Sequence, residues 1–257
     1  MQCPQCQFQQ ADSNPECLKC GVIFEKYFSR QQNKAKGTTR DQDDDLFERN
    51  EVPVTSLWDL FFWLPTQVNW FYFSGRAVLF IVMVTWGVQF MSASIESNYA
   101  GHSFMHLINL PFHEAGHIFF MPFGSFMTSL GGSLGQLLMP LVCLGVLLLK
   151  TRDPFGASVS LWWFAQNFFD LAPYINDARS GTLPLLGGNT GQSSPYGFHD
   201  WQFILTESHL LKLDHFLARL SAAIGTVLMF VSFLWAAILL YKQYRAINEG
   251  ESYRSGC

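Results

Sequence analysis

The sequence predicts an all-α polytopic membrane protein, with about four to five spans and a small separate unit at its N-terminus. The 257 residues are 49% hydrophobic and 16% aromatic but only 14% charged, whereas soluble domains average about 25% charged residues. The charges are also unevenly placed, since the only formally charged side chains between Ala77 and Leu149 are Glu96 and Glu114. We therefore expect an N-terminal unit at 1–28, a linker at 29–56 and a transmembrane domain at 57–245.

The net charge argues against one class of partner. The formal net charge is −4, and acidic and basic residues are mixed along the chain. Nucleic-acid binding depends on a basic surface that attracts phosphates. We expect no nucleic-acid partner.

Two CxxC pairs open the chain, as CPQC and CLKCG. Each pair can present two thiolates from a tight turn, and four thiolates complete the tetrahedral shell of a structural zinc ion. Disulfide pairing is the alternative, but the chain begins without the features of a secretory signal peptide, which favours metal. Residues 1–28 resemble a small zinc ribbon, whose metal supplies the folding energy that so short a chain lacks. The expected ligands of this structural zinc are Cys3, Cys6, Cys17 and Cys20.

The rest of the chain divides by its apolar content. We expect residues 29–56 to be a disordered linker, because 29–50 has almost no apolar side chains. Residues 57–73 are rich in aromatic residues and broken by Pro65, as is typical of a segment in the lipid headgroup region. After Arg76, the 19 uncharged residues AVLFIVMVTWGVQFMSASI are long enough to cross the hydrocarbon core. Further candidate helices lie near 104–127, 134–149, 156–176 and 216–241.

Basic residues flank three of these segments, at Arg76, at Lys150 with Arg152, and at Lys242 with Arg245. The positive-inside rule places such residues in the cytoplasm. All three groups can lie there only if segment 104–127 is re-entrant or doubles back, whereas five full spans would leave the C-terminus outside. We expect an integral membrane protein with a cytoplasmic N-terminus, and the side of the C-terminus stays open.

The apolar run NLPFHEAGHIFFMPF contains two histidines and a glutamate. On a helix, His113 and His117 project from one face because they are four residues apart, so both imidazoles can bind a single Zn²⁺. Glu114 is placed to take a proton from a water whose pKa the metal lowers to about 7. A chance match is the alternative, but a carboxylate within an apolar segment is costly unless it is paired, and such residues are usually functional.

A catalytic zinc site takes a third protein ligand and keeps a fourth position open. Residues 162–179 supply two candidates, Asp170 within the apolar stretch and Asp177 near its end. Asp170 is six residues from that end, or about 9 Å of helix, so it can meet the histidines in mid-membrane. In the following loop, His199 and Asp200 are further candidates for a ligand or for a residue that supports one.

This arrangement resembles the site-2 protease class of intramembrane zinc metalloproteases. In that class an HExxH helix is completed by an aspartate from a later span, usually within an Asn…Pro…Asp-Gly sequence. The likeness covers residues 75–180, and His113, Glu114 and His117 match its first motif.

The second motif matches less fully. Asn167, Pro173 and Asp177 are in place, but Ala178 stands where glycine is usual. The motif favours Asp177 as the third ligand and depth in the membrane favours Asp170, so both stay open. The resemblance also makes Asn167 a candidate for substrate binding.

The segment GSFMTSLGGSLGQLLMP lies between the two motifs. We expect Gly131, Gly132 and Gly135 to allow close helix packing. The competing interpretation is an extended edge that binds an unwound substrate by strand addition. Gln136 is a candidate for orienting the substrate.

Two more histidines, His102 and His106, precede the HEAGH motif. His106 lies about two turns before His113, on a similar face of the expected helix. We expect each to be a core or interfacial histidine.

The resemblance implies an integral-membrane zinc metalloendopeptidase that hydrolyses peptide bonds of a membrane-protein or peptide substrate in or near the bilayer. It implies one catalytic zinc beside the structural zinc of the ribbon, with Glu114 activating water and then protonating the leaving nitrogen. The alternative is a non-proteolytic zinc-binding membrane protein with a role in recognition or sensing, for which the ribbon would bind a protein partner. An open coordination position and Glu114 have no obvious use in a structural site, which favours the enzyme.

Overall fold

The computed structural model describes residues 1–11, 14–28, 56–64 and 69–255, and side chains as far as residue 249. The chain separates into two compact units, Met1–Pro53 and Val54–Cys257. The expected linker at 29–56 lies outside the described residues except for Ser56. In the described ranges the fold is helical, with three isolated β-bridges and no strand, so the prediction of an all-α protein is confirmed.

The N-terminal unit consists of two knuckles with the same hydrogen bonds. The N–H groups of Cys3 and Cys17 each donate to the carbonyl five residues later, at 2.9 Å in both cases. The residues four positions on, Gln7 and Gly21, donate back to the cysteine carbonyls at 2.9 and 2.8 Å and have φ of 60° and 71°. Positive φ closes each turn tightly, so the two cysteines of a pair lie side by side. Phe24, only 6% exposed, packs on the cysteines and supplies the small core.

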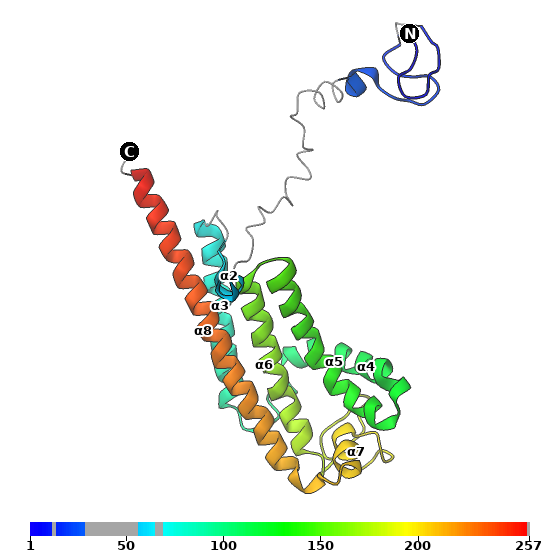
Figure 1. Ribbon diagram of the computed structural model, residues 1–257. Helices are drawn as coiled ribbons and strands as arrows, with labels where there is room; N and C mark the ends of the chain where they lie inside the picture. Colours follow the sequence, from blue (N-terminus) through cyan, green and yellow to red (C-terminus); the bar gives the residue numbers. More distant parts are fainter. Residues whose placement is uncertain (12–13, 29–55, 65–68, 256–257) are drawn as a thin grey trace. The chain divides into compact units, whose positions relative to one another are not determined.

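The second unit contains seven α-helices within the described residues (Figure 1): α2 (Leu57–Phe62), α3 (Trp70–Ser92), α4 (Phe104–Phe120), α5 (Ser125–Gly145), α6 (Pro154–Asn176), α7 (Asp200–Glu207) and α8 (Asp214–Ser255). The turn Val146–Lys150 extends α5 as a π-helix. The predicted segments near 156–176 and 216–241 correspond to α6 and α8. The predicted boundary between segments 104–127 and 134–149 is wrong, because α4 ends at Phe120 and α5 begins at Ser125, after a break at Gly124 with φ of 93°.

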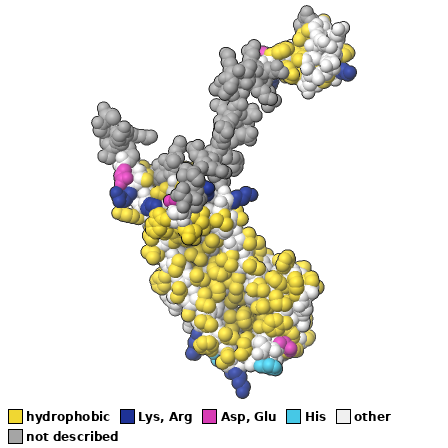
Figure 2. All heavy atoms as spheres, viewed as in Figure 1, with side chains coloured by type: hydrophobic (Ala, Val, Ile, Leu, Met, Phe, Trp, Pro, Cys, Tyr) yellow, Lys and Arg dark blue, Asp and Glu magenta, His cyan; other side chains and the backbone are white. Residues whose placement is uncertain are grey.

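Three of these segments are long and apolar enough to cross a membrane: Trp70–Ser92, Ser125–Lys150 and Leu211–Glu249. Of the remaining candidates, α4 has 17 residues, and α6 has 23 residues but carries several buried polar side chains. Figure 2 shows hydrophobic side chains over most of the visible face of this unit, with charged side chains gathered towards its ends. Membrane localisation is consistent with these findings, and a total of four to five spans stays a prediction.

Helix α6 is the centre of the second unit. It lies beside α8 and also packs on α3 and α5 (Figure 1). Trp162 and Phe169 of α6 share an apolar cluster with Met83 and Phe90 of α3 and Met229 of α8. Because neighbouring helices cover α6, its polar side chains can be buried in protein instead of facing lipid.

Helices α4 and α5 form an antiparallel hairpin held together by glycines. A Cβ atom at Gly116 would collide with the carbonyl oxygen of Gly131, and one at Gly135 would collide with the carbonyl oxygen of Phe112. The predicted close packing at Gly131 and Gly135 is therefore confirmed. The extended edge considered for this segment does not occur, because the segment is helical from Ser125 onward.

Three basic groups predicted to flank apolar segments lie at one end of the second unit: Arg76, Lys150 with Arg152, and Lys242 with Arg245. Arg76 near the start of α3 forms an ion pair of 3.0 Å with Asp153 at the start of α6. Lys242, towards the end of α8, donates to the carbonyl of Phe62 in α2 at 2.7 Å. Loop 177–199 and α7 lie at the opposite end (Figure 1). Helix α4 packs antiparallel on α5, and the side of the membrane on which the basic groups lie stays a prediction.

Candidate metal centres

The four N-terminal cysteines form a cluster that could hold a metal ion, since their sulfur atoms all lie within 4.8 Å of one another. Cys3 Sγ is 3.7 Å from Cys20 Sγ, and Cys6 Sγ is 3.5 Å from Cys17 Sγ. A disulfide would bring sulfurs to about 2.05 Å, whereas tetrahedral zinc with Zn–S of about 2.3 Å separates them by about 3.75 Å. All four thiols are free. Desolvation opposes ionisation of Cys17, but hydrogen bonds from the backbone N–H groups of Cys20 and Lys19 lower the pKa of this thiol to about 6.

A second candidate centre is the HEAGH motif, where His113, Glu114 and His117 also meet the geometric requirement for metal binding. Both rings are oriented through their Nδ1 atoms. His117 Nδ1–H donates to the carbonyl oxygen of Thr128 at 2.8 Å, and His113 Nδ1–H donates to Oε1 of Gln136 at 2.7 Å. These bonds leave the two Nε2 atoms available to a metal ion, and an Nδ1–H bonded to protein is the usual arrangement of a metal-binding histidine.

Asp200 faces both Nε2 atoms. Its Oδ2 lies 3.3 Å from His113 Nε2 and 3.4 Å from His117 Nε2. Ligands about 2.0–2.1 Å from a tetrahedral zinc ion are separated by about 3.3 Å. Two nitrogen lone pairs and a carboxylate oxygen repel one another at this separation unless a cation or protons lie between them. The donor set and its spacing therefore fit a divalent metal ion such as zinc.

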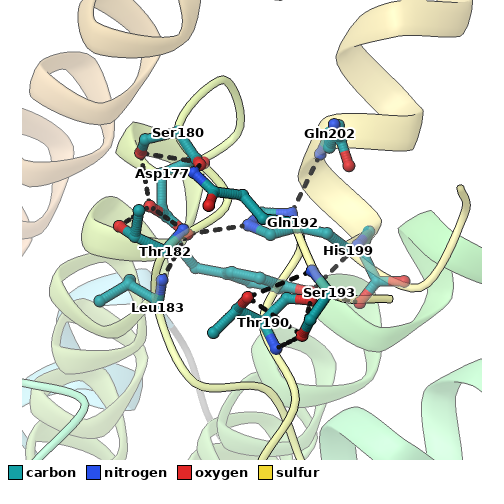
Figure 3. A network of polar contacts seen from close by, with 11 residues as sticks. Asp177, Ser180, Thr182, Leu183, Thr190, Gln192, Ser193, His199 and Gln202 are labelled. Atoms are coloured by element: carbon teal, nitrogen blue, oxygen red, sulfur yellow. Dashed lines mark hydrogen bonds and ion pairs between the residues drawn. The ribbon is translucent and has the colours of Figure 1, made fainter. Parts of the chain in front are cut away.

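Asp177 stabilises the loop that connects α6 to α7, just before Asp200 (Figure 3). Its carboxylate accepts hydrogen bonds from the hydroxyl of Ser180, from the backbone N–H groups of Thr182 and Leu183 at 2.9 Å, and from the hydroxyl of Thr182. His199 Nε2 approaches the same carboxylate at 3.3 Å. Burial alone would raise the pKa of Asp177, but His199, Ser180 and the two backbone N–H groups lower it well below its usual range.

Helix α7 begins where this loop ends. His199 is its N-cap, and Nδ1 of His199 accepts from the N–H of Gln202 at 3.1 Å. Asp200 is the first residue of the helix and has a side chain only 10% exposed. Tyr174 of α6 fixes Asp200 twice, because its hydroxyl donates to Oδ2 at 3.2 Å and accepts from the backbone N–H at 3.0 Å.

Gly132 lies directly beneath the two imidazoles. A Cβ atom there would lie 2.5 Å from His113 Nε2 and 2.6 Å from His117 Nε2. Carbon and nitrogen atoms do not approach so closely without displacing one another. A residue without a side chain is therefore required where α5 passes the candidate centre.

The histidines and Asp200 open into a cavity of about 440 Å³. Glu114, His106 and Asp170 line the same cavity, and so do residues of the 183–198 loop, including Leu185 and Leu186. In the candidate centre, the buried His113 and Asp200 and the half-buried His117 thus face an open cavity.

The other residues predicted for the site have different partners. Asp170 accepts a hydrogen bond from Asn109 at 2.9 Å and pairs with His106 at the same distance. Both of its carboxylate oxygens therefore have partners other than His113 and His117. Asp177 is used in the loop network described above. Their roles as metal ligands remain untested predictions.

The two residues predicted to bind substrate are both buried. Asn167 donates to the backbone of Trp163 within α6 and does not line the cavity. Gln136 lines the cavity, but its amide nitrogen is enclosed and without a partner, while its oxygen orients His113. Substrate binding by either residue stays a prediction.

Sequence reasoning missed three contributors to the centre: Thr128, Gly132 as a neighbour of the histidines, and Tyr174. Thr128 acts through its backbone carbonyl, which no side-chain pattern can indicate. Tyr174 follows Asp170 by one turn of α6. This spacing predicts that the two side chains share a helical face, but it does not predict the hydrogen bond between Tyr174 and Asp200.

Comparisons with protein-family models, with curated proteins and with solved structures found no match to this chain. The likeness to site-2 proteases therefore remains a resemblance carried by the HEAGH motif and the later aspartates.

Proposed function

We propose that this chain is an integral-membrane zinc hydrolase, and most specifically a metalloendopeptidase acting on peptide bonds in or near the membrane. The proposal rests chiefly on one observation: the two Nε2 atoms of HEAGH and the Asp200 carboxylate converge at 3.3–3.4 Å beside Glu114 in an open cavity. His113, His117 and Asp200 would hold the zinc, and a further zinc in the four-cysteine ribbon would be structural.

The chain's own residues then have defined tasks. Bound zinc supplies Lewis acidity, which polarises a carbonyl and acidifies water. Glu114 takes the proton of the attacking water and returns it to the leaving nitrogen of the cleaved amide. Gln136 and the Thr128 carbonyl hold the imidazoles in the required tautomer, and Tyr174 holds Asp200.

The position of the basic residues supports an orientation. Five basic residues belong to the end of the second unit opposite loop 177–199 and Asp200: Arg76, Lys150, Arg152, Lys242 and Arg245. Three others, Arg179, Lys212 and Arg219, belong to the other end, near the start of α8. The positive-inside rule would place that end in the cytoplasm. The N-terminus with its ribbon is then cytoplasmic, and the cavity opens towards the other face of the membrane.

The test compares purified wild-type protein in detergent with Glu114→Gln on a panel of single-span membrane substrates. Glu114→Gln should keep its zinc and lose about 10²- to 10⁴-fold in turnover, as expected when acid–base catalysis is lost. Glu96→Gln is the matched control, because Glu96 is the other carboxylate of the 77–149 stretch and is exposed. Unchanged cleavage with unchanged zinc in Glu114→Gln would refute the hydrolase mechanism.

A non-proteolytic zinc-binding protein is the second candidate. The ribbon favours it, because Leu18 is 70% exposed beside a closed four-cysteine cluster, as a recognition module would be. This candidate predicts zinc at both centres without cleavage of any substrate in the panel.

A further inference from the structure

A polar network in the cavity wall lies outside the proposed metal-binding set. His106 of α4 and Asp170 of α6 approach to 2.9 Å through Nδ1 and Oδ1. The carboxylate can only accept, so the His106 Nδ1–H is the donor. Asn109 Nδ2 donates to the other Asp170 oxygen at 2.9 Å, and Trp163 Nε1–H donates to the side-chain oxygen Oδ1 of Asn109 at 2.8 Å. Both oxygens of Asp170 are thus satisfied within the protein.

His106 is where this network meets the cavity. Its side chain is 38% exposed and lines the same cavity as His113 and Glu114. In the described part of the chain no group hydrogen-bonds to its Nε2. Asp170, by contrast, has a side chain only 2% exposed and an ion pair with His106 alone among the described residues. Since a buried carboxylate needs a compensating positive charge, the pair favours a protonated imidazole with Nε2–H as a free donor.

The spacing along α4 determines what this donor can reach. His106 and His113 are seven residues apart, or about 10 Å along the helix axis. An extended peptide advances about 3.3 Å per residue. His106 is therefore too far from the metal ligands to contact the bond being cleaved, but it can reach a substrate group about three residues away.

We propose that His106, positioned by Asp170, binds an oxygen atom of the substrate about three residues from the scissile bond. The oxygen belongs either to a backbone carbonyl or to the C-terminal carboxylate of a short substrate. This proposal rests on the hydrolase function proposed above, and it gives Asp170 a positioning role in place of metal ligation.

The test measures binding, which requires no turnover. The zinc-loaded full-length protein is titrated with acetohydroxamate and with a series of alanine peptides that bear a hydroxamate. The peptides extend from the hydroxamate by one, two or three residues in either chain direction. Affinity should rise when the chain reaches the length that spans to His106. His106→Ala should remove that gain, about tenfold for one charge-assisted hydrogen bond, and leave the affinity for acetohydroxamate unchanged. His106→Gln, which keeps an N–H donor, should retain part of the gain.

His102→Ala is the matched control, because His102 lines the same cavity and should leave the whole series unchanged. Peptides that end in an amide or in a carboxylate distinguish the two oxygen sources. If His106→Ala weakens the binding of both peptides equally, the bound oxygen is a backbone carbonyl. If it weakens only the peptide with a free carboxylate, the bound oxygen belongs to the C-terminus. The proposal is overturned if His106→Ala leaves the length dependence intact or weakens acetohydroxamate equally. Failure of acetohydroxamate to bind the wild type would instead overturn the hydrolase site itself, and the His106 proposal with it.

Discussion

The two candidate metal centres of this chain are built in opposite ways. The ribbon takes its four sulfurs from two turns within 18 residues of sequence, and each turn places its own pair. The second centre takes its histidines from α4 and faces them with Asp200, 83 residues further along the chain. A structural centre can be assembled from local turns because the metal organises them. An open centre has fewer protein ligands, so the packed helices must fix the position of each ligand and shield it from solvent.

Metal removal should separate the two centres most strongly. Structural zinc contributes about 10–16 kcal/mol in comparable small domains, so chelation should unfold residues 1–28 while the helical unit keeps its secondary structure. Hydrogen exchange in each unit measures this directly. Persistent protection of the cysteine turns in zinc-free protein would contradict a metal-dependent ribbon.

Gly132→Ala should abolish metal binding at the second centre alone. The added methyl group would lie 2.5–2.6 Å from both imidazole Nε2 atoms, so the ligands must move out of the geometry that zinc requires. Elemental analysis should show one zinc per chain in place of two. Gly145→Ala in the same helix is the control, because its Cβ would meet no atom within 4 Å. Two zinc ions in Gly132→Ala would show that the histidines bind no metal in this arrangement.

Asp200→Asn should weaken zinc binding at the second centre by at least about 100-fold, because loss of a ligand should exceed the 10- to 100-fold cost of losing a residue that supports one. Asp170→Asn, which alters a carboxylate that lines the same cavity, should keep the metal. Zinc titration against a competing chelator gives both affinities. Retention in Asp200→Asn with loss in Asp170→Asn or Asp177→Asn would return the ligand role to one of the earlier aspartates.

Tyr174→Phe should weaken the same zinc by about tenfold, the lower range for residues that orient a ligand. It removes only the hydroxyl that holds Asp200 at 3.2 and 3.0 Å, and leaves the ring against His199. The chelator titration applies here too. An unchanged affinity would mean that α7 positions Asp200 without help from α6.

Asp177→Asn should have the smallest effect, on stability. The pKa of Asp177 is lowered in the folded state, so its contribution to stability is fully present above the usual aspartate pKa of about 3.9. It begins to decrease below that pH and is lost as the pH falls through the lower pKa of the folded state. At pH 7 the variant should melt about 2–4 °C lower, the shift caused by about 1 kcal/mol. The difference should shrink as the pH is lowered towards 3. A constant difference from pH 7 to pH 3 would show that the carboxylate charge is not what holds the loop.

The sequence alone determined the local parts of this protein. Charge depletion and apolar length located α3, α6 and α8, because a long apolar segment must satisfy its own backbone. They misplaced the boundary between α4 and α5, since Gly124 lies inside the predicted segment 104–127. The CxxC spacing identified all four ribbon cysteines, and the HEAGH spacing identified two imidazoles on one helical face. Each of these features depends on residues within a few turns of one another.

Only the tertiary structure decided which acidic residue faces the histidines. Three aspartates were available, and Asp170 lies on a helix that packs beside α4, yet its carboxylate is taken by His106 and Asn109. Asp177 has the matching motif but is used to fold the loop. Asp200 reaches the histidines because that loop and Tyr174 carry it there. Sequence spacing determines which residues share a helical face, but which faces meet depends on the packing of the whole bundle, and that packing is not encoded in any single segment.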